Sequence, residues 1–275
     1  MAKIRTAVLQ TPVSPEKEKN LDRIAEVLER DILRDVDLVT LPEMFACPYD
    51  TQVFPEYAEP EGGPTWQFLS RLAAEKKIYL SAGSIPEVDD DGKVYNTAYV
   101  FDREGRQIAK HRKVHLFDID IEGGQAFRES ATLTAGNKAT VFDTEFCKMG
   151  LCICYDIRFP ELARLMADQG AKVILCPGAF NLTTGPAHWE LLFRSRAVDN
   201  QVYYIGTSPA RDLNASYVAY GHSLVVDPWG IIVSEMDERA HVRVVDIDLD
   251  RVDEVREQLP LMKHRRKDIY ELVAK

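Results

Sequence analysis

Three reactive side chains follow directly after apolar segments of the sequence. Glu43 follows the segment DLVTLP, Lys113 follows IAKHR, and Cys154 follows MGLCI. Short apolar runs of this kind predict buried strands. Because the ends of neighbouring strands in an open α/β sheet converge on one crevice, we expect the carboxylate, the ammonium and the thiol to lie close together.

These side chains have complementary roles in acyl transfer. A carboxylate beside a thiol can act as the general base that removes the thiol proton. A lysine ammonium can stabilise first the thiolate and then the oxyanion of a tetrahedral intermediate. Cys154 also lies at a predicted turn from a strand into a helix, in the segment CICYDIRFPE, where a helix N-terminus favours a thiolate. The combination predicts a cysteine-dependent hydrolase of acyl amides.

Each residue taken alone has a simpler interpretation. Cys152 and Cys154 are both compatible with buried positions in a strand, since free cysteine is among the most buried residue types. Glu43 is compatible with the first turn of a helix, and Lys113 with a solvated position in a basic run. The catalytic hypothesis therefore rests on the three residues together.

The elements that must position these residues first alternate between strands and helices and later form hairpins. Strands are predicted at residues 4–9, 37–41, 78–85, 94–101, 107–112, 149–153, 173–176, 202–207, 223–226, 231–234 and 242–247, and helices near residues 18–32, 65–77, 158–169, 186–200 and 249–258. The segment 114–137 lacks periodicity and is predicted to be a long loop over the site. This order favours an α-β-β-α sandwich with two mixed sheets, built as one domain over residues 1–275.

Composition and charge exclude several classes of protein. The chain has 275 residues, 45% of them hydrophobic and 28% charged, which is typical of a globular protein with a closed core. Its net charge of −10 opposes binding to nucleic acid or to an anionic membrane. The first ten residues resemble no secretory signal, and no apolar run approaches the length of a membrane span.

The cysteines and the absence of cofactor motifs narrow the expectation further. Five cysteines without a CxxC pair indicate a reducing compartment, so we expect a cytoplasmic protein. No GxGxxG motif follows a predicted strand and no GxxxxGK[ST] motif occurs, so no nucleotide cofactor is expected. His111 and His115 have the spacing of helical metal ligands, but the segment reads as extended and lacks further ligands. We therefore expect no metal.

Substrate contacts are expected close to Cys154. Arg158, four residues further on, can reach the far end of a short substrate, and its planar guanidinium suits a carboxylate. The alternative is an ion pair with Glu161 or Asp156 on a helix surface. Four aromatic residues that flank the motifs are candidates either for the walls of a small pocket or for the core: Phe45, Tyr49, Phe117 and Phe180.

Several longer segments together resemble the nitrilase superfamily of carbon–nitrogen hydrolases. They are LPEMF, HRKVHLFDIDIEGG, the pair Glu129-Ser130, CYDIRFPE, FNLTTGPAHWELLFRSRAVDNQ, YGHSLVVDPWG and LPLMKHRRKDIY, and they span nearly the whole chain. Within this superfamily the sequence looks most like the omega-amidases, which hydrolyse the terminal amide of 2-oxoglutaramate and 2-oxosuccinamate. The segments HLFDID and FNLTTGPAHWELLFRSRAVDNQ are most similar to that branch.

The resemblance implies a role for each matching residue. Glu43 would be the general base, Lys113 the oxyanion stabiliser and Cys154 the nucleophile, with Glu129 as a second carboxylate that orients the lysine and the substrate amide. The backbone N–H of Tyr155 would complete the oxyanion hole. The reaction would form a thioester, release ammonia and then hydrolyse the thioester, without any cofactor.

The resemblance also implies partners and leaves alternatives open. A homodimer or a higher homo-oligomer is expected, and related carbamoylases use an arginine at the place of Arg158. The helix that contains His188, Trp189, Glu190, Arg194 and Arg196 is interpreted as structural or dimer-facing. Alternative activities are those of a deaminated glutathione amidase, an N-carbamoyl hydrolase or a true nitrilase. A catalytically silent scaffold protein is the alternative from a different class.

Overall fold

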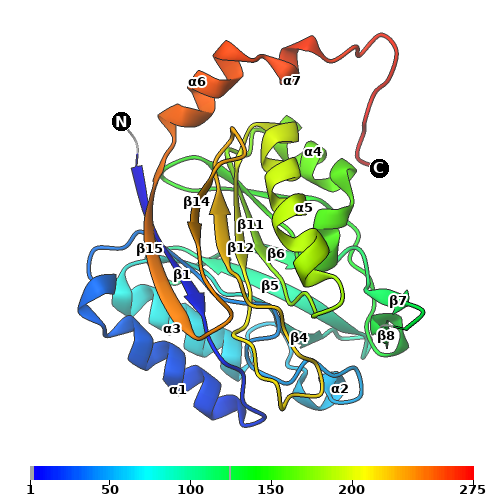
Figure 1. The fold of residues 1–275 in the computed structure, drawn as a ribbon. Helices are drawn as coiled ribbons and strands as arrows, with labels where there is room; N and C mark the ends of the chain where they lie inside the picture. Colours follow the sequence, from blue (N-terminus) through cyan, green and yellow to red (C-terminus); the bar gives the residue numbers. More distant parts are fainter. Residues whose placement is uncertain (1–2, 124) are drawn as a thin grey trace.

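Two mixed β-sheets face each other in the computed structural model, which describes residues 3–123 and 125–275 (Figure 1). The first sheet has seven strands, in the order β15 (His241–Asp248), β1 (Lys3–Gln10), β2 (Leu38–Thr40), β3 (Tyr79–Ser81), β5 (Val94–Phe101) and β4 (Ile85–Val88), and β6 (Gln107–Arg112) also pairs with β5. The second sheet has six strands, in the order β14 (Ile232–Glu235), β13 (Leu224–Val226), β12 (Tyr203–Thr207), β11 (Val173–Pro177), β10 (Lys148–Leu151) and β9 (Thr140–Asp143).

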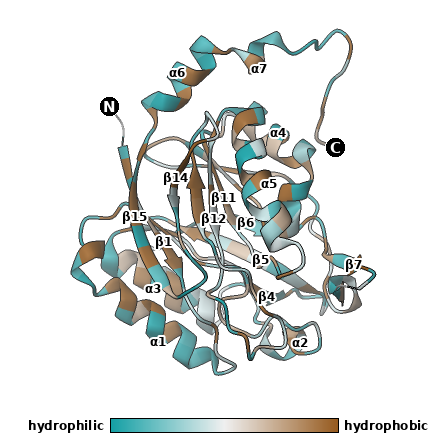
Figure 2. Ribbon diagram, in the orientation of Figure 1, coloured by the Kyte–Doolittle hydropathy of each residue, from teal (hydrophilic) through white to brown (hydrophobic). Residues whose placement is uncertain are grey.

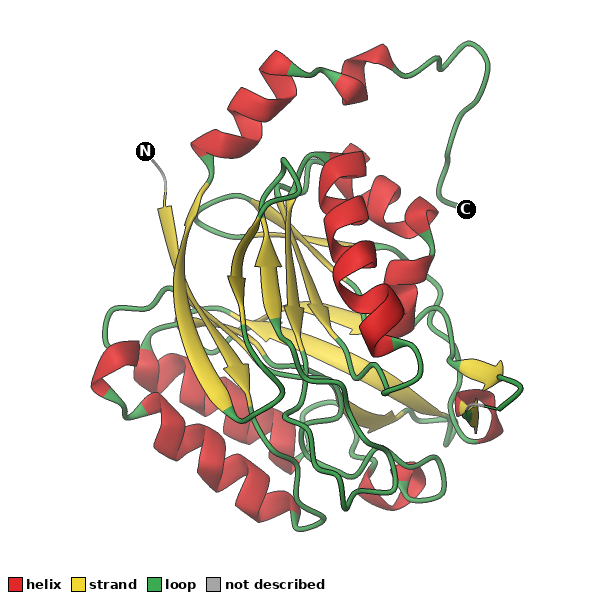
Figure 3. Cartoon of the chain, in the orientation of Figure 1, coloured by secondary structure: helices red, strands yellow, loops and turns green. Residues whose placement is uncertain are grey.

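Helices cover the outer face of each sheet. Helices α1 (Lys17–Leu28) and α3 (Pro64–Lys76) lie against the first sheet, and α4 (Pro160–Asp168) and α5 (Gly185–Asn200) lie against the second (Figures 1 and 3). This is the α-β-β-α sandwich that the sequence predicted, so the expected fold class is confirmed. The short helix α2 (Phe54–Tyr57) and the C-terminal helices α6 (Asp250–Gln258) and α7 (Leu261–His264) complete the set.

The inner strands are buried on both faces, which explains why they read as continuous apolar runs. In β1, Ile4 and Val8 point into the core between the sheets, whereas Ala7 and Leu9 pack under the outer helices. Successive strand residues point to opposite faces, so a strand buried on both sides needs apolar residues at nearly every position. Figure 2 shows this as hydrophobic colour along the central strands, for example β12, and mixed colour on the helices.

Several predicted boundaries differ from the observed ones; the predicted helix 18–32, for example, ends at Leu28. Three of the differences concern residues that position the site. The predicted strand 78–85 is split into β3 and β4 at Gly83, which has a φ of +59° and lies so close to Pro42 that a Cβ would be 2.1 Å from its carbonyl oxygen. The predicted strand 149–153 ends at Leu151. The predicted helix 158–169 begins only at Pro160, after a 3₁₀ turn at Cys154–Arg158.

The predicted loop 114–137 contains structure of its own. A small hairpin is formed by β7 (Asp118–Asp120) and β8 (Ala126–Arg128), and a 3₁₀ turn follows at Glu129–Ala131. The loop returns closely past the end of β6, because the N–H of Gly136 donates to the carbonyl oxygen of Lys113 at 2.8 Å. Glu129 is thereby brought next to the end of β6. No helix in the described part of the chain is both long and apolar enough to cross a membrane.

Candidate active site

Glu43 lies in the loop after β2 and is fully buried. Its Oε1 accepts hydrogen bonds from Lys113 Nζ at 3.0 Å and from Asn96 Nδ2 at 2.8 Å, and its Oε2 accepts one from the backbone N–H of Ala179 at 2.7 Å. Asn96, in β5, also accepts a backbone hydrogen bond from the N–H of Lys113 at 2.8 Å. The pairing of β5 with the end of β6 therefore fixes the lysine relative to the carboxylate.

Lys113 is fully buried between two carboxylates. Its Nζ lies 2.8 Å from Oε1 of Glu129, whose Oε2 accepts the backbone N–H of Phe117 at 2.7 Å. Burial acts to lower the pKa of Lys113, but the charges of Glu129 and Glu43 outweigh it and raise that pKa well above its usual value. Burial, together with the charge of Glu43, raises the pKa of Glu129, although Lys113 opposes this rise. The lysine is thus a permanent cation in this site.

Tyr49 joins the two carboxylates through its hydroxyl group. The hydroxyl oxygen lies 2.5 Å from Oε1 of Glu129 and 3.1 Å from Oε1 of Glu43, and it accepts from Lys113 Nζ at 3.3 Å. Burial raises the pKa of Tyr49 well above its usual value, and both carboxylates raise it further. The hydroxyl therefore keeps its proton and acts as a hydrogen-bond donor. Tyr49 is thus part of the hydrogen-bonded group around Lys113 as well as a residue of the pocket wall.

Cys154 begins the 3₁₀ turn after β10 and is 3% exposed. Its φ of +47° is in the left-handed region, which is uncommon for a residue with a side chain and is often found at functional sites. Burial raises the pKa of the Cys154 thiol well above its usual value, and the charge of Glu43 adds to the rise, while Lys113 opposes it. The resting group is a protonated thiol next to a carboxylate, so a base must take up its proton as the sulfur attacks.

Cys154 lies at the predicted turn from a strand into a helix, but the helix that begins there is the short 3₁₀ turn Cys154–Arg158, and α4 begins only at Pro160. The backbone N–H of Tyr155 makes no hydrogen bond to any residue in the described part of the chain, so it is available to an oxyanion. The ring of Tyr155 packs edge-on against Phe117, with centroids 5.1 Å apart. The two candidate donors for the oxyanion, this N–H and Lys113, lie at the ends of β10 and β6.

Asp156 connects the cysteine turn to the lysine strand. Its buried carboxylate accepts hydrogen bonds from His111 Nε2 at 3.0 Å, from His115 Nδ1 at 2.8 Å, and from the backbone N–H groups of His115 and Ile153 at 2.9 and 3.0 Å. Burial acts to raise the pKa of Asp156, but the histidine hydrogen bonds outweigh it and hold that pKa well below the usual range. The two histidines flank Lys113, so we call this arrangement the Asp156 bridge.

Replacing Asp156 by asparagine is expected to destabilise the protein and to slow catalysis. An amide cannot accept from both histidines, so the free energy of unfolding should fall by about 2 to 3 kcal/mol, and kcat should fall about tenfold as Cys154 and Lys113 lose alignment. Urea unfolding and steady-state kinetics measure the two effects. Asp22→Asn, an exposed change on α1, is the control.

The pH dependence of this destabilisation has a defined sign. A carboxyl group whose pKa is lowered by folding stabilises the fold above its unfolded pKa of about 3.9 and loses that contribution as the pH falls towards its folded pKa. The difference in unfolding free energy between wild type and Asp156→Asn should therefore be constant from about pH 7 to 5 and shrink below about pH 4. A difference that grows on acidification would contradict the bridge.

Arg158 does not form the ion pair that was considered for it. Within residues 3–123 and 125–275 it makes no salt bridge with Glu161 or with Asp156, which is bound by the histidines. Its NH1 instead lies 3.1 Å from Nδ1 of His188, and its Cζ lies 4.7 Å from the ring centroid of Phe180. Arg158 is therefore a half-buried cation without an acidic partner in the described part of the chain.

The other predicted pocket residues separate into two groups. Phe117 packs with Ala179 and Tyr217 in a cluster that also contacts Tyr49 and Tyr155. Phe180 is buried beneath Arg158. Phe45, in contrast, packs in the core between the first sheet and helices α1 and α3. The structure thus brings all the predicted residues except Phe45 into one region.

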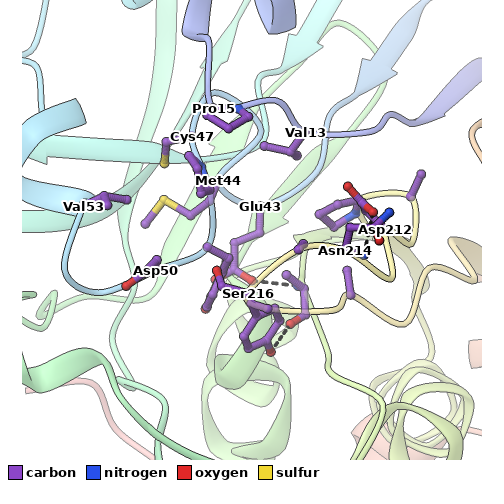
Figure 4. Close-up of a pocket in the computed structure, with 18 residues that line it drawn as sticks. Val13, Pro15, Glu43, Met44, Cys47, Asp50, Val53, Asp212, Asn214 and Ser216 are labelled. Atoms are coloured by element: carbon purple, nitrogen blue, oxygen red, sulfur yellow. Dashed lines mark hydrogen bonds between the residues drawn. The ribbon is translucent and has the colours of Figure 1, made fainter.

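A cavity of about 390 Å³ lies beside this region (Figure 4). Figure 4 shows Glu43 extending from the loop that also carries Met44 and Cys47 towards the loop that carries Asn214 and Ser216. Tyr49 and Tyr217 line the cavity and also belong to the aromatic cluster next to Glu129 and Cys154. The aromatic rings therefore form the inner wall of the cavity, close to the reactive groups.

Sequence reasoning missed Asn96, Asp156 and His188 as parts of the site. A buried asparagine inside the apolar strand VYNTAYVF was a usable signal for Asn96, because a buried amide requires partners. Asp156 and His188 carried no comparable signal, because their partners are distant in the sequence. His188, interpreted as structural or dimer-facing, lies within hydrogen-bond distance of Arg158.

The fold and this cluster define a hydrolase with a buried thiol, and comparison with known proteins gives its family. A family model described as carbon-nitrogen hydrolase matches residues 5–257. The chain belongs to the carbon–nitrogen hydrolase family, as the resemblance to the nitrilase superfamily indicated, and acts on carbon–nitrogen bonds.

Individual relatives are similar over the whole chain. The chain is 50% identical to the omega-amidase NIT2 of Xenopus tropicalis and 49% identical to that of Homo sapiens, in each case over 100% of this chain and 99% of the relative. Among solved structures, Nit3 of Saccharomyces cerevisiae, a member of branch 10 of the nitrilase superfamily, has a TM-score of 0.89 and 48% identity, covering 96% of this chain and 97% of that one. The NitFhit protein of C. elegans has a TM-score of 0.91 and 35% identity, covering 99% of this chain and 67% of that one.

Proposed function

We propose that this protein is an omega-amidase, which hydrolyses the terminal amide of 2-oxoglutaramate and 2-oxosuccinamate to the acid and ammonia. The observation that carries the proposal is the fully buried Lys113, held between Glu43 and Glu129 beside the Cys154 thiol. The full-length relatives named omega-amidases support the substrate class.

In the first half of the reaction, Glu43 takes the proton of the Cys154 thiol as the sulfur attacks the amide carbon. The carbonyl oxygen becomes an oxyanion, stabilised by the Lys113 ammonium and the N–H of Tyr155. Collapse of the tetrahedral intermediate breaks the carbon–nitrogen bond, and the proton held by Glu43 passes to the leaving nitrogen. The products of this half are ammonia and a thioester of Cys154.

In the second half, a water molecule attacks the thioester carbon while Glu43 again takes up the proton. The new oxyanion meets the same two donors, and its collapse releases the carboxylic acid as the proton returns to the sulfur. Lys113 holds its own proton throughout because its pKa is raised well above the usual value: burial opposes this, but the charges of Glu129 and Glu43 prevail. Its role is electrostatic, and Glu129 and Tyr49 position it.

Arg158 supports the choice of a substrate that carries a carboxylate. A guanidinium without an acidic partner is well suited to the free carboxylate of a short 2-oxo acid amide. It is separated from Cys154 by a single 3₁₀ turn, which suits a substrate only a few atoms long. An N-carbamoyl amino acid carries the same carboxylate, so an N-carbamoyl hydrolase is the second candidate that this observation favours.

The test is a comparison of kcat/KM for ammonia release from 2-oxoglutaramate, glutamine, an N-carbamoyl amino acid and a simple nitrile, and for release of the amine product from deaminated glutathione. We expect 2-oxoglutaramate to be preferred by at least about tenfold, because the site must bind both the carboxylate and the amide. A preference for the carbamoyl or nitrile compound would refute the omega-amidase proposal. Absence of turnover on every substrate would favour the silent scaffold.

We further propose that the protein acts as a cytoplasmic homo-oligomer built from one domain. The free thiols of all five cysteines support a reducing compartment. Exposed apolar side chains gather on α5 and the adjacent turn before β14, where Leu191 is 61% exposed and Trp229 49% exposed. A patch of this kind is typical of a protein interface, and a second copy of the chain is the expected partner. Sedimentation velocity measures the oligomeric state.

A further inference from the structure

We propose that His188 is a positioning residue for Arg158 and thereby determines the preference of the enzyme for amides that carry a free carboxylate. The inference rests on the proposed function, because it concerns the far end of the same substrate. It assigns a role to a residue of α5 that lies outside the reacting groups.

The hydrogen bond between the two side chains fixes the state of the histidine. Arg158 NH1 and His188 Nδ1 are 3.1 Å apart, and a guanidinium can only donate. Nδ1 must therefore be the acceptor, which makes His188 a neutral imidazole with its proton on Nε2. Burial, together with the charge of Arg158, lowers the pKa of His188, which favours this neutral form.

The same hydrogen bond decides which edge of the guanidinium is left for a ligand. NH1 is held by His188, whereas Nε is buried and has no hydrogen-bond partner in the described residues. Nε and NH2 form the edge that binds a carboxylate with two parallel hydrogen bonds. Because one end is fixed by the imidazole, this edge is held in a single orientation.

Among the described residues, the surroundings of Arg158 supply an apolar support but no counter-charge. The guanidinium lies against the ring of Phe180, with Cζ 4.7 Å from the centroid, and near that of Tyr155, at 5.5 Å. The titratable groups whose charges affect it are Cys154, Tyr155 and Tyr217, none of which is a carboxylate. An incoming carboxylate would therefore satisfy both the buried Nε–H and the uncompensated charge.

Replacing His188 by alanine should act on the Michaelis constant rather than on turnover. We expect KM for 2-oxoglutaramate to rise about tenfold or more with kcat within about threefold, since a fixed guanidinium contributes to binding rather than to the chemical step. For butyramide, which has no carboxylate, both constants should change less than about threefold. His188→Gln, whose amide oxygen can accept from NH1, should restore most of the affinity, and His264→Ala, a change in α7, is the control. Equal effects of His188→Ala on both amides would overturn the inference.

A binding experiment separates this inference from the proposed function. Titration of the Cys154→Ala protein with 2-oxoglutarate, the acid product, measures carboxylate binding without turnover. Adding His188→Ala should weaken this binding about tenfold or more, and adding His188→Gln should restore it. An unchanged dissociation constant would overturn the role of His188 even if 2-oxoglutaramate is hydrolysed. Weakened binding in an enzyme that does not hydrolyse 2-oxoglutaramate would refute the proposed function and leave the role of His188 standing.

Discussion

Replacing Cys154 by alanine is expected to lower kcat for amide hydrolysis by about 10⁴-fold or more, because no thioester can form without the nucleophile. The remaining groups, Lys113 and the N–H of Tyr155, would still bind the substrate amide, so its dissociation constant should change little. Ammonia release under saturating substrate measures the first effect, and calorimetric titration measures the second.

The neighbouring cysteine provides a matched control for this variant. Cys152 is as deeply buried as Cys154, but its sulfur lies 3.2 Å from the hydroxyl of Tyr204, inside the core. Cys152→Ala should therefore cost about 1 kcal/mol of unfolding free energy and leave kcat within about threefold of wild type. If Cys152→Ala abolished turnover and Cys154→Ala did not, Cys154 would have to be abandoned as the nucleophile.

Lys113→Ala is expected to lower kcat by about 100-fold or more, since the loss of one oxyanion donor typically has an effect of that size. The variant also leaves Glu43 and Glu129 facing each other without the cation between them. Burial already raises the pKa of Glu129, and the loss of Lys113, which opposes that rise, should raise it further. Tyr49 hydrogen-bonds to both Glu129 and the base Glu43, so protonation of Glu129 also disturbs the base, and we expect the acid limb of the pH–rate profile to move to higher pH.

Steady-state kinetics across the pH range measures both consequences, with Lys138→Ala as the control. Lys138 is exposed and lies near the same loop, so its loss removes one positive charge without touching the site. Turnover of Lys113→Ala within tenfold of wild type would remove the lysine from the mechanism. If turnover were low but the pH profile unshifted, Lys113 would still be assigned to the oxyanion. Its proposed electrostatic effect on the two carboxylates would then be wrong.

The reactive residues were predictable because each is marked by local sequence. Glu43, Lys113 and Cys154 each follow a short apolar run, and strands buried on both faces give such runs whatever the surrounding fold. Their convergence followed from the general rule for strand ends in α/β sheets. The fold class was predictable for the same reason, since local periodicity indicates the order of strands and helices. The family was predictable from its motif segments, and the family model over residues 5–257 confirms it.

The boundaries of strands and helices were less predictable where a contact with a distant segment or a local turn ends the element. Residues 78–85 are apolar enough for one strand, but Gly83 passes so close to Pro42 that the strand stops and restarts. The start of α4 was placed too early because the segment after Cys154 forms a 3₁₀ turn, which has no distinct sequence pattern. Both differences concern the residues that position the site.

By itself, the sequence determined which chemistry the chain can carry: a thiol, a base and a cation at three strand ends, in an acidic protein with a sandwich fold. Only the tertiary structure decided which neighbours shift the pKa values of these groups and which hydrogen bonds fix their positions. The hydroxyl of Tyr49 reaches Glu129 across 80 residues of sequence, and His188 reaches Arg158 across 30. A buried polar group takes whichever partner the packed chain places within about 3 Å. Which partner this is depends on the distances between folded segments. The local pattern of hydrophobic residues does not predict those distances.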